Sequence, residues 1–331
     1  MRILIAGGAG YVGSALVPAL LERGYEVEVV DLLWFGNHLP KEVPVQLKDV
    51  TEISENDLRG VDQVIFLAGL SNDPMAEYSP SRNFIYNAAC PSYLAYVAKR
   101  AGVKRYIYAG SCSVYGYTEN NLYDEDSPAV SHFPYGISKL QGEFAALQMH
   151  SDDFSVIAFR KGTICGYSPR MRFDLVVNTM FKTALTDGVI TVNNPGIWRP
   201  ILSMQDAVSA YVRAIECNWS ISGVFNIASG NYTLGEIADD VRREVEGRTG
   251  PSLRLNIKHD QDLRNYKVNF EKAQKVLSFK PRHEVTDIVR ELIERKSAFG
   301  DFSDPRYYNI ITFKMLEESE AARRESAGAA R

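Results

Sequence analysis

Tyr135 and Lys139 are the pair of side chains in this chain best suited to moving a proton. They stand four residues apart at the start of a predicted helix, so both side chains lie on one face. A tyrosine at its reference pKa of ~10 is a poor base, and lowering that pKa by about three units takes about 4 kcal/mol. An ammonium group ~4 Å away supplies about this energy at an effective dielectric constant of ~20. The pair therefore predicts that Tyr135 removes the proton of a hydroxyl group.

The segment GSCSVYG, residues 110–116, offers two hydroxyls and a thiol but no carboxylate. Serine has no useful basicity near neutral pH, so Ser111 and Ser113 are candidates for hydrogen bonding to a substrate. The thiol of Cys112, with a reference pKa of ~8.5, could carry a proton if a nearby cation lowered that pKa. Cysteine is also a common small buried side chain. The residues alone leave both interpretations of Cys112 open.

A glycine-rich turn, GGAGYVG at residues 7–13, follows the first predicted strand and opens the first predicted helix. Glycines at 7, 10 and 13 permit a tight turn, a close approach of the backbone to a pyrophosphate, and helix-on-strand packing. The free N–H groups at the start of the helix then face the phosphates. Asp31 ends the second strand, where a carboxylate binds the ribose hydroxyls of NAD and repels the 2′-phosphate of NADP. The turn and the acid together predict an NAD site.

Alternating strands and helices must position these groups. Continuous apolar runs rich in valine, isoleucine and tyrosine predict strands that are buried on both faces. These runs lie at residues 2–7, 26–31, 62–68, 104–111, 155–160 and 223–229. Between them lie a helix that ends at Gly24 and amphipathic helices near 83–101 and 136–149. The alternation predicts an α/β fold with a doubly wound parallel sheet of the Rossmann type.

After residue 229 the pattern changes, and we expect a smaller, mostly helical C-terminal lobe. Helices are predicted at 234–246, 270–277 and 284–298, and one short strand at 252–257. The polar, alanine-rich segment 317–331 has no apolar face and is expected to be a flexible tail. The predicted division assigns to the sheet domain residues 1–160 plus about 201–229, and to the second lobe about 161–200 and 230–316.

Composition excludes several classes of protein. The 331 residues are 45% hydrophobic and 24% charged with a net charge of −4, so no nucleic-acid or membrane partner is expected. The four cysteines and five histidines are scattered, so no metal site is expected and a reducing cytoplasm is the expected location. No secretion signal precedes the first strand, and no apolar run has the length of a membrane span.

The glycine turn, the GSCSVYG segment and the Tyr135–Lys139 pair together resemble the extended short-chain dehydrogenase/reductase family, over about residues 1–315. Within it, the chain looks like the NAD-dependent nucleotide-sugar epimerases and dehydratases. The resemblance implies that Ser111 hydrogen-bonds the sugar hydroxyl that is oxidised, that Tyr135 is the base and that Lys139 holds the nicotinamide ribose. The full set of expected cofactor-binding residues is Gly7, Gly10, Tyr11, Val12, Gly13, Asp31, Asp49, Ala68, Asn87, Tyr135 and Lys139, of which Asn87 matches an asparagine that braces the active site.

The second lobe is expected to bind a nucleotide-diphosphate sugar. Guanidinium groups match phosphate oxygens, which makes Arg170 and Arg172 candidates for the diphosphate. The resemblance adds Arg199 and Arg264, which match arginines that hold the diphosphate in the family. Thr163 departs from the family pattern, because relatives often carry an asparagine there. The expected substrate-binding residues are Ser111, Ser113, Thr163, Arg170, Arg172, Arg199 and Arg264.

The absence of a carboxylate at positions 112 and 113 distinguishes between the reactions that members of the family catalyse. Its 4,6-dehydratases carry an Asp-Glu pair where this chain has Cys112 and Ser113, and its decarboxylases carry a glutamate at the position of Ser113. The resemblance then implies chemistry that needs only Tyr135, Ser111 and NAD, which is epimerisation, expected at C4 through a transient 4-keto sugar. Three alternatives stay open: an NAD(H)-dependent nucleotide-sugar 4-dehydrogenase or ketoreductase, a 3,5-epimerase or dehydratase assisted by Cys112, and a dinucleotide-sensing protein without turnover.

Family members commonly form dimers by packing two helices of each subunit into a four-helix bundle. The matching helices are those at 83–101 and 136–149, so a homodimer is expected. The residues leave open which nucleotide and which sugar are used.

Overall fold

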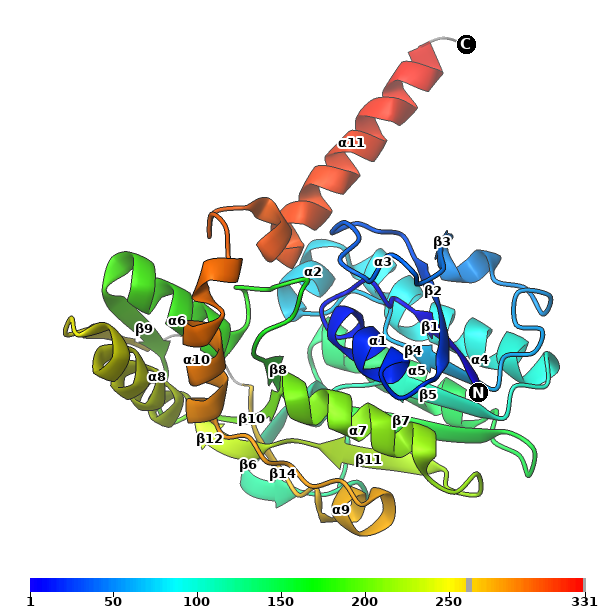
Figure 1. Ribbon diagram of the computed structural model, residues 1–331, viewed down its shortest axis with the longest axis horizontal. Coiled ribbons are helices and arrows are strands. Elements are labelled where there is room, and N and C mark those ends of the chain that lie inside the picture. The colour runs from blue at the N-terminus through cyan, green and yellow to red at the C-terminus, as the bar shows by residue number, and fades with distance from the viewer. Residues whose placement is uncertain (260–263, 330–331) are drawn as a thin grey trace.

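A computed structural model describes residues 1–259 and 264–329 of the chain. Its centre is a sheet of seven parallel strands in the order β11-β7-β5-β4-β1-β2-β3 (Figure 1). The strands are β1 (Arg2–Ala6), β2 (Glu26–Asp31), β3 (Val45–Leu47), β4 (Gln63–Phe66), β5 (Arg105–Ala109), β7 (Ser155–Lys161) and β11 (Gly223–Ile227). The strand order changes direction at β1, so the predicted doubly wound sheet of the Rossmann type is confirmed.

Helices cover both faces of this sheet. One face carries α1 (Gly13–Leu21) and α7 (Met204–Glu216), and the other carries α4 (Cys90–Arg100) and α5 (Pro134–Leu147). Successive side chains of a strand point to opposite faces. Ile3 and Ile5 of β1 therefore lie in the core with α1 and α7, whereas Leu4 and Ala6 lie in the core with α4. This burial on both faces explains why the strands read as unbroken apolar runs.

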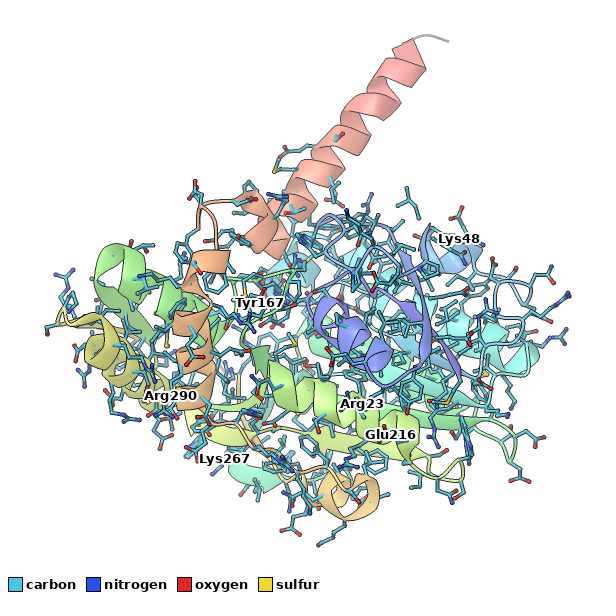
Figure 2. All side chains as sticks on the ribbon, viewed as in Figure 1. Arg23, Lys48, Tyr167, Glu216, Lys267 and Arg290 are labelled. Atoms are coloured by element: carbon cyan, nitrogen blue, oxygen red, sulfur yellow. The ribbon has the colours of Figure 1, made fainter. Side chains whose placement is uncertain are left out.

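The second lobe is built on three helices that pack on one another. These are α6 (Val176–Asp187), α8 (Leu234–Thr249) and α10 (Val285–Glu294), and they lie beside β9 (Val189–Asn193), which pairs with β13 (Arg254–Lys258). Arg290 of α10 forms an ion pair of 2.8 Å with Glu244 of α8 at the surface of the lobe (Figure 2). The predicted helical character of this lobe agrees with its three helices.

Two small sheets join the lobe to the body. One contains β8 (Thr163–Cys165), β10 (Trp198–Ser203) and β12 (Gly230–Thr233), and the other pairs β6 (Tyr117–Tyr123) with β14 (Asn265–Val268). The prediction of a single strand after residue 229 is wrong, because β12 and β14 lie there as well as β13. Strands of four residues that pair with distant segments carry too little apolar pattern to be predicted.

The helix predicted at 83–101 is interrupted once. It is observed as α3 (Pro80–Phe84), a π-helical segment at Ile85–Ala89, and α4. At the C-terminus, α11 (Asn309–Ala329) runs as one helix that projects away from the body (Figure 1). The expected tail from residue 317 is therefore helical up to Ala329, and residues 330 and 331 lie outside the described ranges.

The described ranges contain no candidate membrane-spanning helix and no candidate metal-binding cluster. No helix there combines the length and the apolar character that crossing a bilayer requires. No three His, Cys, Asp or Glu side chains of those ranges are grouped so as to hold a metal ion.

Candidate active site

A cavity of about 650 Å³ lies at the carboxyl ends of the central strands. Its walls include the segments that follow β1, β4, β5 and β7, together with residues of the second lobe. A smaller cavity of about 110 Å³ shares Gly7, Gly10 and Ala68 with it and continues towards Asp31 at the end of β2. Ligands of doubly wound sheets bind at this edge, where the strand order reverses.

The glycine turn has the shape that a dinucleotide pyrophosphate needs. Gly7 has a φ of +79°, and a Cβ there would lie 2.4 Å from the Ala68 nitrogen. A Cβ on Gly13 would lie 2.2 Å from the Gly8 oxygen, so this glycine allows the close packing of α1 on the turn that follows β1. Gly10 lines both cavities, and Tyr11 and Val12 line the larger one. The residues therefore fit the backbone cradle of a nucleotide cofactor.

Asp31 and Asp49 both line the smaller cavity, beside Trp34 and Phe35. The Asp31 carboxylate accepts the N–H groups of Ala9 at 3.0 Å and of Leu33 at 2.8 Å. Burial raises the pKa of Asp31, and these two hydrogen bonds oppose that rise. Asp49 accepts the N–H of Thr51 at 2.8 Å and so caps the short helix at Val50–Glu52.

Ser111, Tyr135 and Lys139 meet on one wall of the larger cavity. Ser111 follows β5 and accepts hydrogen bonds from the Ser113 N–H at 3.2 Å and the Ser113 hydroxyl at 2.9 Å. Tyr135 is the second residue of α5, and the Ser111 side chain lies near enough to its hydroxyl to lower the pKa of Tyr135. Lys139, one turn further on, donates to the Ala109 oxygen at 3.3 Å, and its Nζ lies 5.8 Å from the centre of the Tyr135 ring. The three predicted catalytic groups are thus adjacent.

The electrostatics of these groups differ from the prediction. Burial, with a smaller contribution from Asp73, raises the pKa of Tyr135, while Ser111 and Arg172 lower it. Burial and the charge of Lys161 lower the pKa of Lys139 to about 7. The prediction that Lys139 lowers the pKa of Tyr135 is therefore wrong for the protein alone, because burial outweighs an ammonium whose own charge is destabilised.

Cys112 does not face the cavity. Its side chain is 1% exposed and lies in a small core with Val114 and Tyr115, and its thiol donates to the Arg160 oxygen at 3.1 Å. Burial raises the pKa of this thiol. An acid–base role for Cys112 is therefore contradicted, whereas Ser113, on the opposite side of the same turn, lines the cavity.

Thr163 and the four predicted arginines all line the cavity. Arg172 donates to both oxygens of Asp174, at 2.8 and 3.1 Å, and to the Ser71 hydroxyl at 3.1 Å. Arg170 donates to Asn309 at 2.5 Å and stacks 3.7 Å from the centre of the Phe35 ring. Burial lowers the pKa of Arg170 to about 9. Protein groups thus hold both of these guanidinium groups in place.

The other two arginines lie close together on the second lobe. Arg199 donates to the backbone oxygens of Trp198, at 3.0 Å, and of Arg264, and it lies 5.4 Å from the centre of the Tyr266 ring. Arg264 forms an ion pair of 2.6 Å with Asp73. Both side chains are partly exposed in the cavity, which leaves them accessible to a phosphate ligand.

Asn87 acts from beneath the cavity. It is fully buried, and its amide donates to the Leu70 oxygen at 2.8 Å and to Asn83 at 2.7 Å. A Cβ on Gly69 would lie 2.3 Å from the Asn87 side-chain oxygen, so the two residues are in close contact. Asn87 therefore braces the loop after β4 and is not among the residues that line either cavity.

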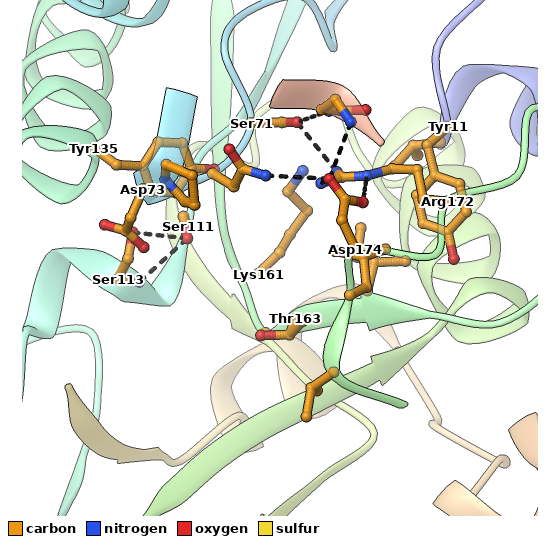
Figure 3. A pocket seen from close by; sticks show the side chains of 18 of the residues that line it. Tyr11, Ser71, Asp73, Ser111, Ser113, Tyr135, Lys161, Thr163, Arg172 and Asp174 are labelled. Atoms are coloured by element: carbon orange, nitrogen blue, oxygen red, sulfur yellow. Dashed lines mark hydrogen bonds and ion pairs between the residues drawn. The ribbon is translucent and has the colours of Figure 1, made fainter. Parts of the chain in front are cut away.

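Sequence reasoning missed three charged residues of this cavity: Asp73, Lys161 and Asp174 (Figure 3). Asp73 opens α2 after β4, Lys161 is the last residue of β7, and Asp174 lies just before α6. Figure 3 shows the Lys161 side chain reaching into the space between Ser111 and Arg172. Lys161 directly follows the predicted strand at 155–160, so its position after a buried strand was the available signal.

Lys161 carries a charge that the described residues leave without an ion-pair partner. Burial lowers its pKa to about 8 from a usual value near 10.5. The unfolded chain thus binds this proton more tightly, so the charged lysine destabilises the folded protein. This loss of stability is complete below pH 8 and becomes smaller as the pH rises towards 10.5. We expect Lys161→Met to stabilise the protein by roughly 1–2 kcal/mol at pH 7, with no such gain at pH 10.5.

Urea unfolding of both proteins at the two pH values measures this difference. The matched control is Lys280→Met at an exposed position, which should give the same stability change at both pH values. A Lys161→Met protein that is less stable than the wild type at pH 7 would contradict the prediction.

Residues 3–228 match the model of the family described as the NAD dependent epimerase/dehydratase family. The chain is 25% identical over 325 residues to a UDP-glucose 4-epimerase of Corynebacterium glutamicum, covering 92% of this chain and 98% of that protein. It is 28% identical over 298 residues to UDP-glucuronic acid decarboxylase 3 of Arabidopsis thaliana, covering 85% of each.

Solved structures share the fold. A UDP-glucose 4-epimerase of Thermotoga maritima, solved with UDP-glucose, superposes with a TM-score of 0.79 at 22% identity over 90% of this chain and 100% of that one. An NAD-dependent NDP-hexosamine 5,6-dehydratase superposes with a TM-score of 0.80 at 24% identity over 90% of this chain and 98% of that one.

Proposed function

Because the chain belongs to the NAD-dependent epimerase/dehydratase family, we propose that it inverts C4 of a nucleotide-diphosphate sugar through a transient 4-keto sugar. The observation that carries this proposal is the meeting of Ser111, Tyr135 and Lys139 on the wall of a cavity that continues into the glycine cradle. The name of the Corynebacterium glutamicum relative supports the same activity.

The glycine cradle and the end of β2 would hold the cofactor. Backbone N–H groups at Tyr11 and Val12, which line the cavity at the start of α1, would bind the pyrophosphate. Asp31 would accept hydrogen bonds from the ribose hydroxyls of the adenosine. Lys139 would hold the nicotinamide ribose. The chemistry that NAD supplies when bound is the reversible acceptance of the hydride from C4.

Tyr135 and Ser111, on the wall of the larger cavity, act on the hydroxyl group of the substrate. Tyr135 takes the proton of the C4 hydroxyl, and Ser111 holds that oxygen by a hydrogen bond. Since burial raises the pKa of Tyr135 in the protein alone, the base needs a nearby positive charge to ionise. The ring of oxidised NAD is such a charge, so Tyr135 should be strongest as a base when that form is bound.

The residues beside Ser111 favour epimerisation over loss of water from C6. Cys112 is buried with a raised pKa, and Ser113 has no useful basicity. Dehydration at C6 needs both an acid and a base in this segment of the family. Return of the hydride to the other face of C4 needs neither.

The nucleotide diphosphate would bind at Arg199 and Arg264. Both lie on the second lobe and face the same cavity as Tyr135. Guanidinium forks suit phosphate oxygens. Arg170 and Arg172, which protein groups already hold, would add positive charge to the cavity without leaving their partners.

A panel of UDP-, GDP-, dTDP- and CDP-sugars, incubated with NAD⁺ and followed by proton NMR, tests the proposal. At least one sugar should be converted to its C4 epimer without net formation of NADH. NADH that accumulates with a stable keto product would instead identify a dehydrogenase. A panel that yields no change at C4 of any sugar contradicts the proposal.

A homodimer is part of this proposal. Four apolar side chains are exposed on the helical layer of π-helix Ile85–Ala89, α4 and α5, namely Ile85, Tyr93, Tyr96 and Phe144. Clustered exposed apolar residues are typical of interaction surfaces, and these helices match those that pair in the family. We expect Phe144→Glu to weaken the dimer at least tenfold, because a charge would be buried in the interface.

Sedimentation velocity from 0.1 to 50 µM would measure this association. Ile257→Glu is the matched control, since Ile257 is an equally exposed apolar residue on β13, in the other lobe. A wild-type protein that sediments as a monomer throughout, or a control as disruptive as Phe144→Glu, would contradict this interface.

A cytoplasmic location also belongs to the proposal. All four cysteines carry free thiols, which suits a reducing compartment. Fractionation of cells that produce the protein would test it, and recovery in an oxidising compartment would contradict it.

A further inference from the structure

A carboxylate stands on the catalytic wall of the cavity after all, although it comes from another part of the chain. Asp73 is the first residue of α2 (Asp73–Tyr78), after the loop that follows β4. Its side chain lines the cavity together with Ser111, Ser113 and Tyr135. Figure 3 shows these four side chains gathered on one side of the pocket, opposite Arg172 and Asp174.

The local backbone holds Asp73 in place. Asn72 caps α2 by accepting the N–H of Met75 at 3.1 Å, and its amide donates to Asp174 at 3.3 Å. Met75 itself is buried. The position of Asp73 in the cavity is therefore determined on both sides of the residue.

The two oxygens of the Asp73 carboxylate have different surroundings. Oδ2 accepts from Arg264 at 2.6 Å, across the cavity from the second lobe. Oδ1 is shielded from solvent, and no group in the described part of the chain hydrogen-bonds it. A buried polar atom without a partner typically costs about 1–3 kcal/mol, so such an atom needs an explanation.

The charge of Asp73 is felt at the hydroxyls of Tyr135 and Tyr266, whose pKa values it raises. Asp73 and Tyr135 lie on the same side of one cavity, so a substrate atom that contacts the Tyr135 hydroxyl lies at the wall that carries Asp73. Under the proposed function that atom is the oxygen on C4 of the sugar. The carbons next to C4 are then the substrate atoms beside Asp73.

Resting on the proposed function, we infer that Asp73 is the general base that removes a proton from C3 or C5 of a 4-keto nucleotide sugar. This activity goes beyond inversion at C4. It assigns to Asp73 the part that an acid after Ser111 plays in other members of the family. Carboxylates do remove protons next to carbonyl groups in enzymes of other folds.

The proton transfer balances without a further reactant. Asp73 accepts the proton, the electron pair of the broken C–H bond forms a C=C bond, and the carbonyl electrons move to the C4 oxygen. Tyr135, protonated after the oxidation step, and Ser111 donate hydrogen bonds to that oxygen. Asp73 then returns a proton to the same carbon, and in deuterated water a deuteron that has exchanged onto the carboxyl group takes its place.

The test supplies the ketone directly, so that it does not depend on hydride transfer. The full-length protein is incubated with a nucleotide-diphosphate 4-keto-6-deoxyhexose in deuterated water, and NMR follows deuterium at C3 and C5. The wild type should exchange one of these positions well above the enzyme-free rate. Asp73→Asn, which keeps the shape of the side chain, should exchange it ~100-fold more slowly, the lower end of the effect of a general base.

The affinity for the ketone separates catalysis from a structural ion pair. Asp73→Asn should bind the ketone within a few fold of the wild type by calorimetry, while exchange at saturating ketone falls ~100-fold. An Asp73→Asn protein whose affinity for the ketone falls as far as its exchange would overturn the inference, since Asp73 would then act only by holding Arg264. Wild-type exchange at the enzyme-free rate would overturn it directly. The sugar panel tests C4 inversion separately, so its result does not depend on this exchange.

Discussion

Replacing Tyr135 with phenylalanine should lower the turnover of the nucleotide sugar by ~10²–10⁴-fold, the usual contribution of a general acid–base group. The substitution removes one oxygen and leaves the ring, so the packing of α5 on the cavity wall is kept. NAD binding should be retained, because the cradle and Asp31 lie on other elements. Turnover by NMR and cofactor affinity by calorimetry measure the two effects separately.

Tyr266→Phe is the matched control for this prediction. Tyr266 is another tyrosine that lines the same cavity, on β14. Removing its hydroxyl should leave turnover within a few fold of the wild type. Equal losses in the two variants would mean that the cavity, and not the Tyr135 hydroxyl, was disturbed.

Replacing Glu143 with glutamine should lower the free energy of unfolding by about 3–5 kcal/mol, the usual cost of removing one partner of a buried ion pair. Glu143 of α5 is fully buried and accepts three hydrogen bonds of 2.7–3.2 Å from Arg160 near the end of β7. The substitution leaves the Arg160 charge buried without a counter-charge. The pair also fastens α5, with Tyr135 and Lys139, to the sheet, so activity should fall with stability.

Chemical unfolding measures the cost, and two further variants support the reason. Glu271→Gln removes an exposed partner of Lys275 and should not change the unfolding midpoint. Glu143→Met combined with Arg160→Met should lose less stability than Glu143→Gln, because it leaves no unpaired charge. A Glu143→Gln protein that unfolds within about 1 kcal/mol of the wild type would contradict the prediction.

The central sheet could be predicted because strands buried on both faces appear in the sequence as continuous apolar runs. Runs such as the one at 2–7 are apolar at every position, and β1 is buried over Ile3–Ala6. The glycine turn was predictable for a similar reason, since Gly7 and Gly13 occupy positions where a Cβ would collide with the backbone. Both signals are local to a few residues.

The short strands and the charged residues of the cavity have no such local pattern in the sequence. β12 and β14 pair with segments far away in the chain, so no local pattern announces them. Asp73, at the start of α2, and Lys161, at the end of β7, are ordinary charged residues in the sequence. Only the meeting of the strand ends at one edge of the sheet brings them into the same cavity as Tyr135. The direction of the Cys112 side chain is set by the turn at Cys112–Tyr115, which places Ser113 in the cavity wall and the thiol in the core.

The electrostatic prediction failed for a different reason. The spacing of Tyr135 and Lys139 correctly predicts that they are neighbours. It does not report how burial changes the pKa values of the two groups. Burial raises the pKa of Tyr135 and lowers that of Lys139 to about 7, so each group favours its neutral form. Spacing reports which side chains are neighbours, whereas burial depends on the whole fold.

The fate of a deuterium atom placed at C4 of the sugar tests the central claim most directly. The protein would convert a C4-deuterated nucleotide sugar, with NAD⁺ in ordinary water, and NMR would read C4 of the epimer. Removal and return of the hydride within one cavity predicts that the epimer keeps its deuterium at C4. An epimer that carries hydrogen from solvent at C4 would contradict the account, because inversion would then proceed by loss of a proton from that carbon.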